Sequence, residues 1–219
     1  MSFWELYSWE RVRDKIRSLP GRLGFEKGDK LSFFGLTLDL ETGYIYDNVL
    51  EEYLSQKDRI GMYFILSLYA ETKIDVGESG EFISLRQICP FVHCPNLKKN
   101  IAALEMIFGE NPKLLYTVAK PFDFKPADLG DAAIKVYALP RIPITLVVWA
   151  GEEGLPPSSE ILFDKSAPHY LSGETSAVCE AALGLARALT GRLILKFAKN
   201  LEMNASAIEF GGCGYTCAE

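Results

Sequence analysis

The chain has 219 residues, of which 48% are hydrophobic and 24% are charged. This length and composition are typical of a folded domain with a sizeable core, and they exclude a disordered chain. The formal net charge is −6, and no run of basic residues occurs. Because a phosphate-binding surface requires clustered Lys and Arg, we expect no nucleic-acid partner.

The N-terminal segment MSFWELYSWERVR lacks the basic start and apolar centre of a signal peptide. The longest nearly uninterrupted apolar run, 61–70, is shorter than the roughly 20 residues that a membrane helix needs. We therefore expect a cytoplasmic protein without membrane attachment. In that compartment the five cysteines should stay reduced. We therefore expect them to bind metal or take part in redox chemistry rather than to form structural disulfides.

The first half of the chain alternates between helical and extended patterns. Apolar residues recur at helical spacing over 9–19, before Pro20-Gly21. The segments 31–39 and 44–46 predict a hairpin with its turn at 41–43. A long helix is expected over 50–71, buried in its second half because it is apolar nearly all round. A short strand follows over 81–85.

The second half of the chain predicts more strands, with a helix at each end. The expected helices span 96–109, 113–119 and 172–191, and the expected strands span 132–138, 142–149 and 161–163. Strand 142–149 is apolar on both faces, which indicates a central position in a sheet. Residues 192–210 suit a strand or a continuing helix, and we favour the helix.

The order of these elements predicts the fold class. Strands are spread along the chain with helices between them, and the clearest connections are hairpins. We expect a single α+β domain in which a mixed or largely antiparallel sheet packs with several helices. Residues 1–190 would form the main domain, and 191–219 a C-terminal extension that ends in a Gly/Cys-rich tail.

One candidate for chemistry combines Asp164, His169 and Glu174. An Asp at a strand end, a His in the next loop and a Glu in a first helical turn could converge to hold a divalent metal or act in acid–base catalysis. Their spacing matches no standard metal-ligand rule. The structural alternative gives Glu174 a helix-dipole role and Asp164 a turn-forming hydrogen bond.

Three charged residues near the central strand are candidates for ligand binding. Glu152 and Glu153 follow the strand, where paired carboxylates could bind a hard cation or a substrate hydroxyl, although such a pair more often lies in a solvated turn. Arg141 precedes the strand and could bind a carboxylate or phosphate through two nitrogens. A structural salt bridge is the alternative for Arg141.

The cysteines suggest a metal site. Cys89, His93 and Cys94 lie in one segment, and Cys213 and Cys217 lie in the glycine-rich tail. Four such ligands could enclose zinc, and thiolates could instead hold an iron–sulfur cluster or a corrinoid cobalt. Neither cysteine pair has the two-residue gap of a zinc knuckle. Alternatively, Cys89 is a core residue and the tail is disordered.

Common catalytic motifs are absent from the sequence. It contains no Walker-type phosphate loop, no Gly-x-Gly-x-x-Gly after a strand, no His-Glu-x-x-His and no Gly-x-Ser-x-Gly. The sequence therefore gives no support to common nucleotide-dependent or hydrolytic mechanisms. Two histidines in the whole chain exclude a His-rich catalytic metal centre.

The chain contains several distinctive motifs: Leu139-Pro140-Arg141-Ile142-Pro143, Trp149 with Gly151-Glu152-Glu153, Leu162-Phe163-Asp164, His169-Tyr170-Leu171 with Glu174, Tyr69, Gly80-Glu81-Phe82-Ile83-Ser84 and Gly130-Asp131-Ala132-Ala133. Together these motifs resemble the family catalogued as domain of unknown function 3786. The resemblance spans about Trp4 to Leu189. It implies relatives mainly in anaerobic bacteria and archaea, some with an iron–sulfur domain like that of corrinoid methyl-transfer proteins. That iron–sulfur domain has a four-cysteine signature. The tail around Cys213 and Cys217 resembles part of this signature but has too few cysteines.

The resemblance carries no assigned activity, so three functions remain open. The first is a binding or accessory protein in anaerobic metal, corrinoid or iron–sulfur metabolism, with a redox or corrinoid protein as partner. The second is a small-molecule enzyme that uses Asp164, His169 and Glu174. The third is a homodimeric interaction module without catalysis.

Overall fold

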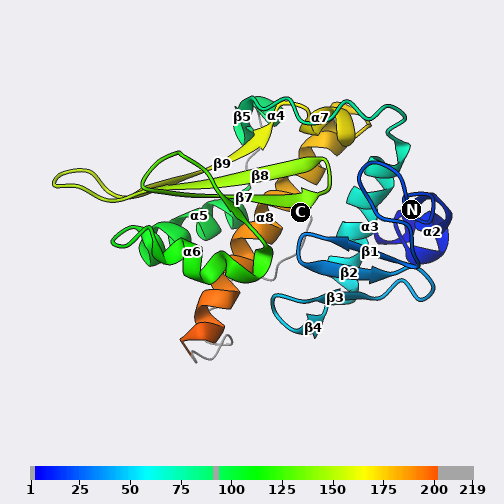
Figure 1. Cartoon of the computed structure of the whole chain (residues 1–219), viewed down its shortest axis with the longest axis horizontal. Coiled ribbons are helices and arrows are strands. Elements are labelled where there is room, and N and C mark those ends of the chain that lie inside the picture. Colours follow the sequence, from blue (N-terminus) through cyan, green and yellow to red (C-terminus); the bar gives the residue numbers. More distant parts are fainter. Residues whose placement is uncertain (1–2, 91–93, 202–219) are drawn as a thin grey trace.

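The computed structural model describes residues 3–90 and 94–201 and contains two antiparallel sheets (Figure 1). The first sheet has four strands in chain order: β1 (Lys30–Phe33), β2 (Leu36–Asp39), β3 (Ile45–Asp47) and β4 (Glu52–Tyr53). The second sheet has the strand order β5-β9-β8-β7-β6, where β5 is Phe82–Ser84, β6 is Lys125–Pro126, β7 is Ala132–Leu139, β8 is Ile142–Trp149 and β9 is Ser158–Asp164. The predicted α+β class with antiparallel strands is confirmed.

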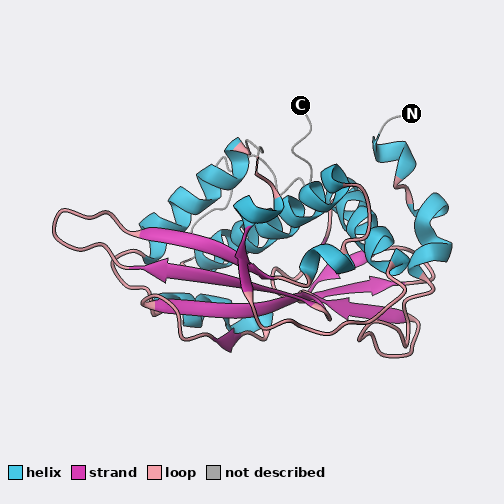
Figure 2. Ribbon diagram, turned by 90° about the horizontal axis from the view of Figure 1, so that it is seen from above, coloured by secondary structure: helices cyan, strands magenta, loops and turns pink. Residues whose placement is uncertain are grey.

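Helices lie before, between and after the strands in the sequence. They are α1 (Phe3–Leu6), α2 (Trp9–Ile16), α3 (Gln56–Glu71), α4 (Leu85–Ile88), α5 (Pro95–Phe108), α6 (Leu114–Ala119), the 3-10 helix η1 (Lys120–Phe122), α7 (Ala167–Tyr170) and α8 (Thr175–Asn200). The two sheets lie end to end along the molecule, and most of the helices lie on one side of the strands (Figure 2). Helix α8 contacts α3, α4, α5 and α6 and so forms the centre of the helical layer.

Strand β8 lies at the centre of the second sheet. It pairs with β7 and β9, and its residues from Ile142 to Val148 are all buried. This burial on both faces confirms the prediction from its uninterrupted apolar sequence. The loop that joins β8 to β9 protrudes at one end of the molecule (Figure 1).

The segment 31–39 forms a hairpin of its own rather than the single strand that we expected. Phe34 and Gly35 both have positive φ angles, 54° and 69°, and these two residues reverse the chain between β1 and β2. Two consecutive left-handed residues are the geometry of a tight hairpin turn, for which Asn-Gly is the usual signal. Because Phe rather than Asn occupies the first position, the sequence did not indicate this turn.

Helix α3 begins later than predicted. The Ser55 side chain caps it by accepting a hydrogen bond from the Asp58 backbone N–H at 3.2 Å, so the helix does not begin at Leu50. All residues from Ile60 to Ala70 are buried, which confirms the expected burial of its second half.

Helix α8 continues beyond the end that we predicted at Gly191, so the helix that we favoured for the segment after it is confirmed as far as Asn200. It runs without a break to Asn200 because Leu193, Ile194 and Ala198 continue its buried surface. Its N-cap is Glu174 rather than Ser172. The proposed boundary between 190 and 191 lies inside this helix, and residues 202–210 of the expected helix lie outside the described residues.

Within the described ranges, no helix combines the length and apolarity required to cross a membrane.

Candidate functional site

A groove of about 520 Å³ lies between α4, α5 and the first half of β9. Its wall is mostly apolar, formed by Leu85, Leu97, Ile101, Trp149, Ile161 and Leu183. Charged and hydroxyl side chains complete the lining, among them Arg86, Lys98, Glu105, Ser159 and Glu160. A groove of this volume, apolar with a few polar groups, has the size and composition of a small-molecule site.

The groove follows from the way that β9 is paired. Strand β5 pairs with β9 only from Leu162 onward, so within the described residues the outer edge of Ser158 to Ile161 has no partner strand. Helix α5 lies along this edge and presents Leu97, Ile101 and Glu105, which share one helical face. The Glu105 carboxylate accepts a hydrogen bond from the Ser159 backbone N–H at 2.9 Å.

Charge is distributed unevenly along the groove. Arg86 on α4 and Lys98 in the first turn of α5 lie near the start of α5, where the helix dipole is also positive. Glu105 lies two turns further along α5, near β9. Arg86 and Lys98 are exposed and make no hydrogen bond or ion pair with a described residue. The groove therefore has a basic end and an acidic end.

Two of the predicted cysteine ligands, Cys89 and Cys94, line this groove and are buried. Cys89 is joined by a disulfide to Cys179 of α8, with a Cα–Cα distance of 5.2 Å. This bond corrects the expectation that the cysteines stay reduced. A disulfide sulfur is not a thiolate, so oxidised Cys89 is not available as a metal ligand.

The other predicted metal ligands, His93, Cys213 and Cys217, lie outside the described residues. Among the residues that the structure does describe, no group of three or more His, Cys, Asp or Glu side chains is placed to hold a metal ion. The disulfide had no signal in the sequence because its two cysteines are 90 residues apart.

Asp164, at the end of β9, is buried and fully engaged in hydrogen bonds. Its carboxylate accepts from the backbone N–H and the hydroxyl of both Ser79 and Ser166, and from the Gly80 N–H, at 2.6–2.9 Å. Burial alone would raise the pKa of Asp164, but the hydrogen bonds from Ser166 and Ser79 hold that pKa well below its ordinary value. The carboxylate thus fastens the loop before β5 to the turn after β9.

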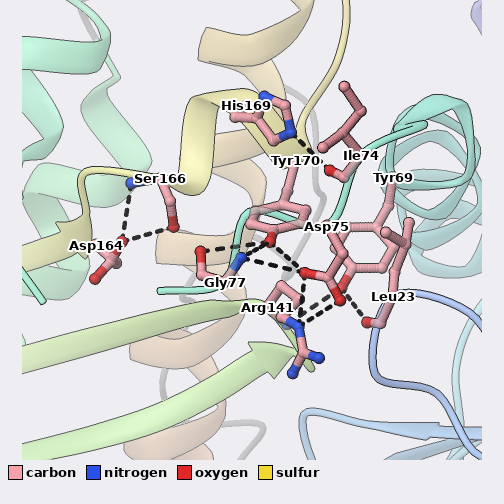
Figure 3. Close-up of polar contacts among 10 residues, drawn as sticks. All are labelled: Leu23, Tyr69, Ile74, Asp75, Gly77, Arg141, Asp164, Ser166, His169 and Tyr170. Carbon is pink, nitrogen blue, oxygen red and sulfur yellow. Dashed lines mark hydrogen bonds and ion pairs between the residues drawn. The ribbon is translucent and has the colours of Figure 1, made fainter. Parts of the chain in front are cut away.

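His169 and Glu174 do not join Asp164. The His169 side chain is exposed, and its Nε2 lies 2.9 Å from the Ile74 carbonyl oxygen. Glu174 is exposed at the N-cap of α8. Figure 3 shows Asp164 directed to Ser166 and the His169 ring directed to Ile74, away from each other. No hydrogen bond among the described residues connects any two of the three.

Arg141 belongs to a network that the sequence did not predict (Figure 3). Its Nε donates to both carboxylate oxygens of Asp75, at 2.9 and 3.0 Å. The Tyr170 hydroxyl donates to Asp75 at 2.6 Å and accepts from the Gly77 N–H at 2.6 Å. The hydrogen bonds from Arg141 and Tyr170 lower the pKa of Asp75 to about 2. The structural alternative for Arg141, a salt bridge, is therefore the one observed.

A second tyrosine connects this network to the N-terminal segment. The buried Tyr69 hydroxyl donates to the Leu23 carbonyl at 2.7 Å and accepts from the Arg141 backbone N–H at 3.1 Å. Burial raises the pKa of Tyr69, so its hydroxyl stays protonated. The members come from four separate parts of the chain, namely Leu23, the segment 69–77, Arg141 and Tyr170, which explains why no local sequence pattern indicated the network.

Glu152 and Glu153 lie in the protruding β8–β9 loop, and both are exposed. The backbone of Glu152 forms a bridge with Leu155, but neither carboxylate makes a hydrogen bond or ion pair with a described residue. Their position agrees with a solvated turn, and the structure adds no partner that would make them a cation site.

The fold and the groove together define an α+β protein with two antiparallel sheets and a ligand-sized cavity beside the edge of the larger sheet. The chain belongs to the family described as Domain of unknown function (DUF3786), whose sequence profile matches residues 25–184. No curated protein and no solved structure matches the chain. The family description assigns no activity to the groove or to the networks.

Proposed function

We propose that the chain is a binding protein for a small amphipathic organic anion, which lies in the groove between α5 and β9. The observation that carries this proposal is the polarised lining. An apolar wall ends at Arg86 and Lys98, two basic side chains that no described residue neutralises. An anionic group of the ligand would pair with these side chains at the positive end of α5, and its apolar body would cover Leu97 and Ile101.

The Cys89–Cys179 disulfide makes this binding sensitive to redox conditions. Cys89 lies at the basic end of the groove, and the bond ties α4 to α8. Reduction would release α4, which carries Leu85 and Arg86 of the lining. We therefore expect a lower affinity for the anion in the reduced protein.

The fluorescent anion 8-anilinonaphthalene-1-sulfonate is a suitable probe because it combines an apolar ring system with one sulfonate. It should bind the folded protein saturably and accept energy from Trp149, which lines the groove. Ala102→Trp would fill the groove and should abolish this binding. Met106→Trp is the matched control, because Met106 lies on the same helix and is 85% exposed.

A charge test separates this site from nonspecific dye binding. Lys98→Gln should weaken binding several-fold, whereas Lys99→Gln, on the neighbouring exposed position outside the lining, should not. Equal binding by the wild type, Ala102→Trp and Met106→Trp, with cooperative unfolding retained in all three, would contradict the proposed site.

A metal or redox accessory role is the second candidate. It is supported by the presence of Cys89 and Cys94 in the lining of one groove. Reduction would free the thiol of Cys89 and that of Cys179, to which Cys89 is bonded. Zinc, iron–sulfur and corrinoid cobalt are the cofactors that such thiolates would take, with a redox or corrinoid protein as partner.

Metal content tests this role directly. Protein purified without oxygen and then reduced should retain stoichiometric zinc, iron or cobalt, and Cys94→Ser and a chain truncated after Phe210 should lose it. Absence of metal from the reduced wild type would exclude the role. Sedimentation of the same samples tests the homodimer prediction, which a monomer at all concentrations would exclude.

A further inference from the structure

The solvent-facing side of the four-stranded sheet carries three tyrosines. The opposite side of this sheet faces the core with Leu31, Phe33, Leu36, Leu38 and Ile45. On the outer side, Tyr46 pairs with Thr37 of β2 and with Tyr53 of β4. Tyr53 and Tyr44 are 67% and 53% exposed, although large aromatic side chains gain more from burial. This arrangement is not required by the core.

The tyrosines line a concave site of about 550 Å³. The Tyr53 ring meets Tyr46 edge to face at a centroid distance of 5.1 Å and meets Tyr44 in the same manner at 6.1 Å. The remaining lining is polar and comprises Lys30, Thr37, Asp39 and Thr42. Rings in mutual edge-to-face contact have little freedom left to lose, so they form a preorganised aromatic platform.

Neighbouring side chains hold this platform in place. The Arg59 guanidinium, from the first turn of α3, lies 4.4 Å from the centroid of the Tyr44 ring. The Asn48 side chain donates to the hydroxyl of Thr37, a residue of the lining, at 3.0 Å. The site is therefore supported from a helix as well as from the sheet.

The charges in the site balance. Asp39 and Lys30 are direct partners across β1 and β2. Asp39 accepts hydrogen bonds from the backbone N–H groups of Glu41 and Thr42 and from the Thr42 hydroxyl through Oδ1. One carboxylate and one ammonium give the lining no net charge, which disfavours a strongly anionic or cationic ligand. They still offer a strong acceptor and a strong donor.

We propose that this tyrosine site binds a neutral oligosaccharide. The C–H faces of sugar rings are apolar and fit the exposed faces of the tyrosines, whereas their hydroxyls both donate and accept hydrogen bonds. Asp39 would accept from sugar hydroxyls, Lys30 would donate to them, and Thr37 and the tyrosine hydroxyls could do either. Three rings side by side favour a chain of several sugars over a single one.

Calorimetric titration with neutral hexasaccharides tests the proposal: maltohexaose, cellohexaose, xylohexaose, mannohexaose and chitohexaose. At least one should bind the wild-type chain. Tyr53→Ala should weaken that binding about tenfold or more, as expected for an aromatic anchor. Tyr53→Phe, which keeps the ring, should lose much less.

The matched control is Phe82→Ala, another exposed aromatic at 49% exposure, on the edge strand of the other sheet. It should bind the sugar as the wild type does, and all variants should unfold cooperatively. Failure of every hexasaccharide to bind, or equal binding by Tyr53→Ala, would overturn the proposal. Stronger binding of hexagalacturonate than of every neutral sugar would overturn its charge argument. A concentration-dependent dimer lost in Tyr53→Ala, without sugar binding, would assign the face to a second copy of the chain instead.

Discussion

Arg192 and Asp47 form an ion pair that is almost completely buried, with side-chain exposures of 2% and 0%. Arg192 donates to both carboxylate oxygens, at 2.6 and 2.8 Å, and its third nitrogen donates to the Phe34 carbonyl at 2.7 Å. Asp47 also accepts from the backbone N–H groups of Val49 and Leu50. The pair joins α8 to the four-stranded sheet, and no nitrogen of the guanidinium is left without a partner.

Removal of one member of this pair should destabilise the protein strongly. Asp47→Asn leaves the Arg192 charge buried without its counter-ion, and we expect a loss of about 3–5 kcal/mol in the free energy of unfolding. Urea denaturation measures this loss. Lys15→Gln breaks the exposed ion pair with Glu71 and should cost less than about 1 kcal/mol. Similar losses in the two variants would show that burial of the Arg192 pair has no energetic consequence.

Asp75 gives the protein a specific response to acid. Its pKa is about 2 in the folded state and 3.8 in the ordinary case, because Arg141 and Tyr170 donate hydrogen bonds to the carboxylate. A lowered folded-state pKa stabilises the fold above about pH 3.8, and this contribution disappears as the pH falls to about 2. Since Asp75 and Arg141 are each 36% exposed, solvent reduces the size of the effect.

Asp75→Asn should therefore reduce the dependence of stability on pH between about 4 and 2. Urea midpoints measured across that range should fall less steeply in the variant than in the wild type. Glu152→Gln, in the exposed β8–β9 loop, is a suitable control and should leave the slope unchanged. If the urea midpoint of Asp75→Asn fell with pH as steeply as that of the wild type, the network would not favour the ionised carboxylate.

At the level of elements, the sequence predicted best those segments whose pattern depends on burial alone. Strand β8 and the second half of α3 are apolar on all sides, and both were located correctly. Errors occurred where tertiary contacts override local signals. Gly191 is a normal helix end, but packing on both sides of it carries α8 to Asn200. Phe34 adopts a left-handed backbone conformation, which an apolar residue rarely does and which the sequence therefore did not indicate.

The candidate site was predictable only in part for a related reason. Cys89 and Cys94 were singled out because they are close in the sequence, and they do share one groove. Their surroundings also include residues of β9 and α8. These elements are far from the cysteines in the sequence, so no local pattern could indicate the contact. Asp164 was recognised as a polar residue at a strand end, but its five hydrogen bonds come from two loops about 85 residues apart in sequence.

The connection between α4 and α8 through Cys89 and Cys179 should contribute measurably to stability. The bond closes a loop of 90 residues, which restricts the unfolded chain, and such bonds typically contribute about 2–4 kcal/mol. Reduction should lower the urea midpoint of the wild type accordingly. Cys179→Ala should resemble the reduced wild type and should not respond further to reductant. An unchanged wild-type midpoint on reduction, with thiols shown to be released, would contradict this expectation.

For the whole molecule, the two sheets provide two different surfaces. The groove beside β9 is apolar with separated charges, whereas the outer face of the smaller sheet is aromatic with balanced charges. Helix α8 and its buried ion pair connect the parts that carry them. The two proposed sites would therefore take chemically different ligands, and we expect that the binding of each can be abolished without disturbing the other.

The pairing of β5 with β9 also has a consequence for the order of folding. Strands β7, β8 and β9 follow one another in the sequence, whereas β5 joins β9 across the whole segment that contains α4, α5 and α6. Closing a long loop costs entropy before its contacts form, so the three-stranded meander should form early and β5 should dock last. In a pulse-labelling experiment during refolding, the amides of β8 should gain protection before those of β5. Cys89, which follows β5 closely, would then meet Cys179 only when the rest of the sheet is complete.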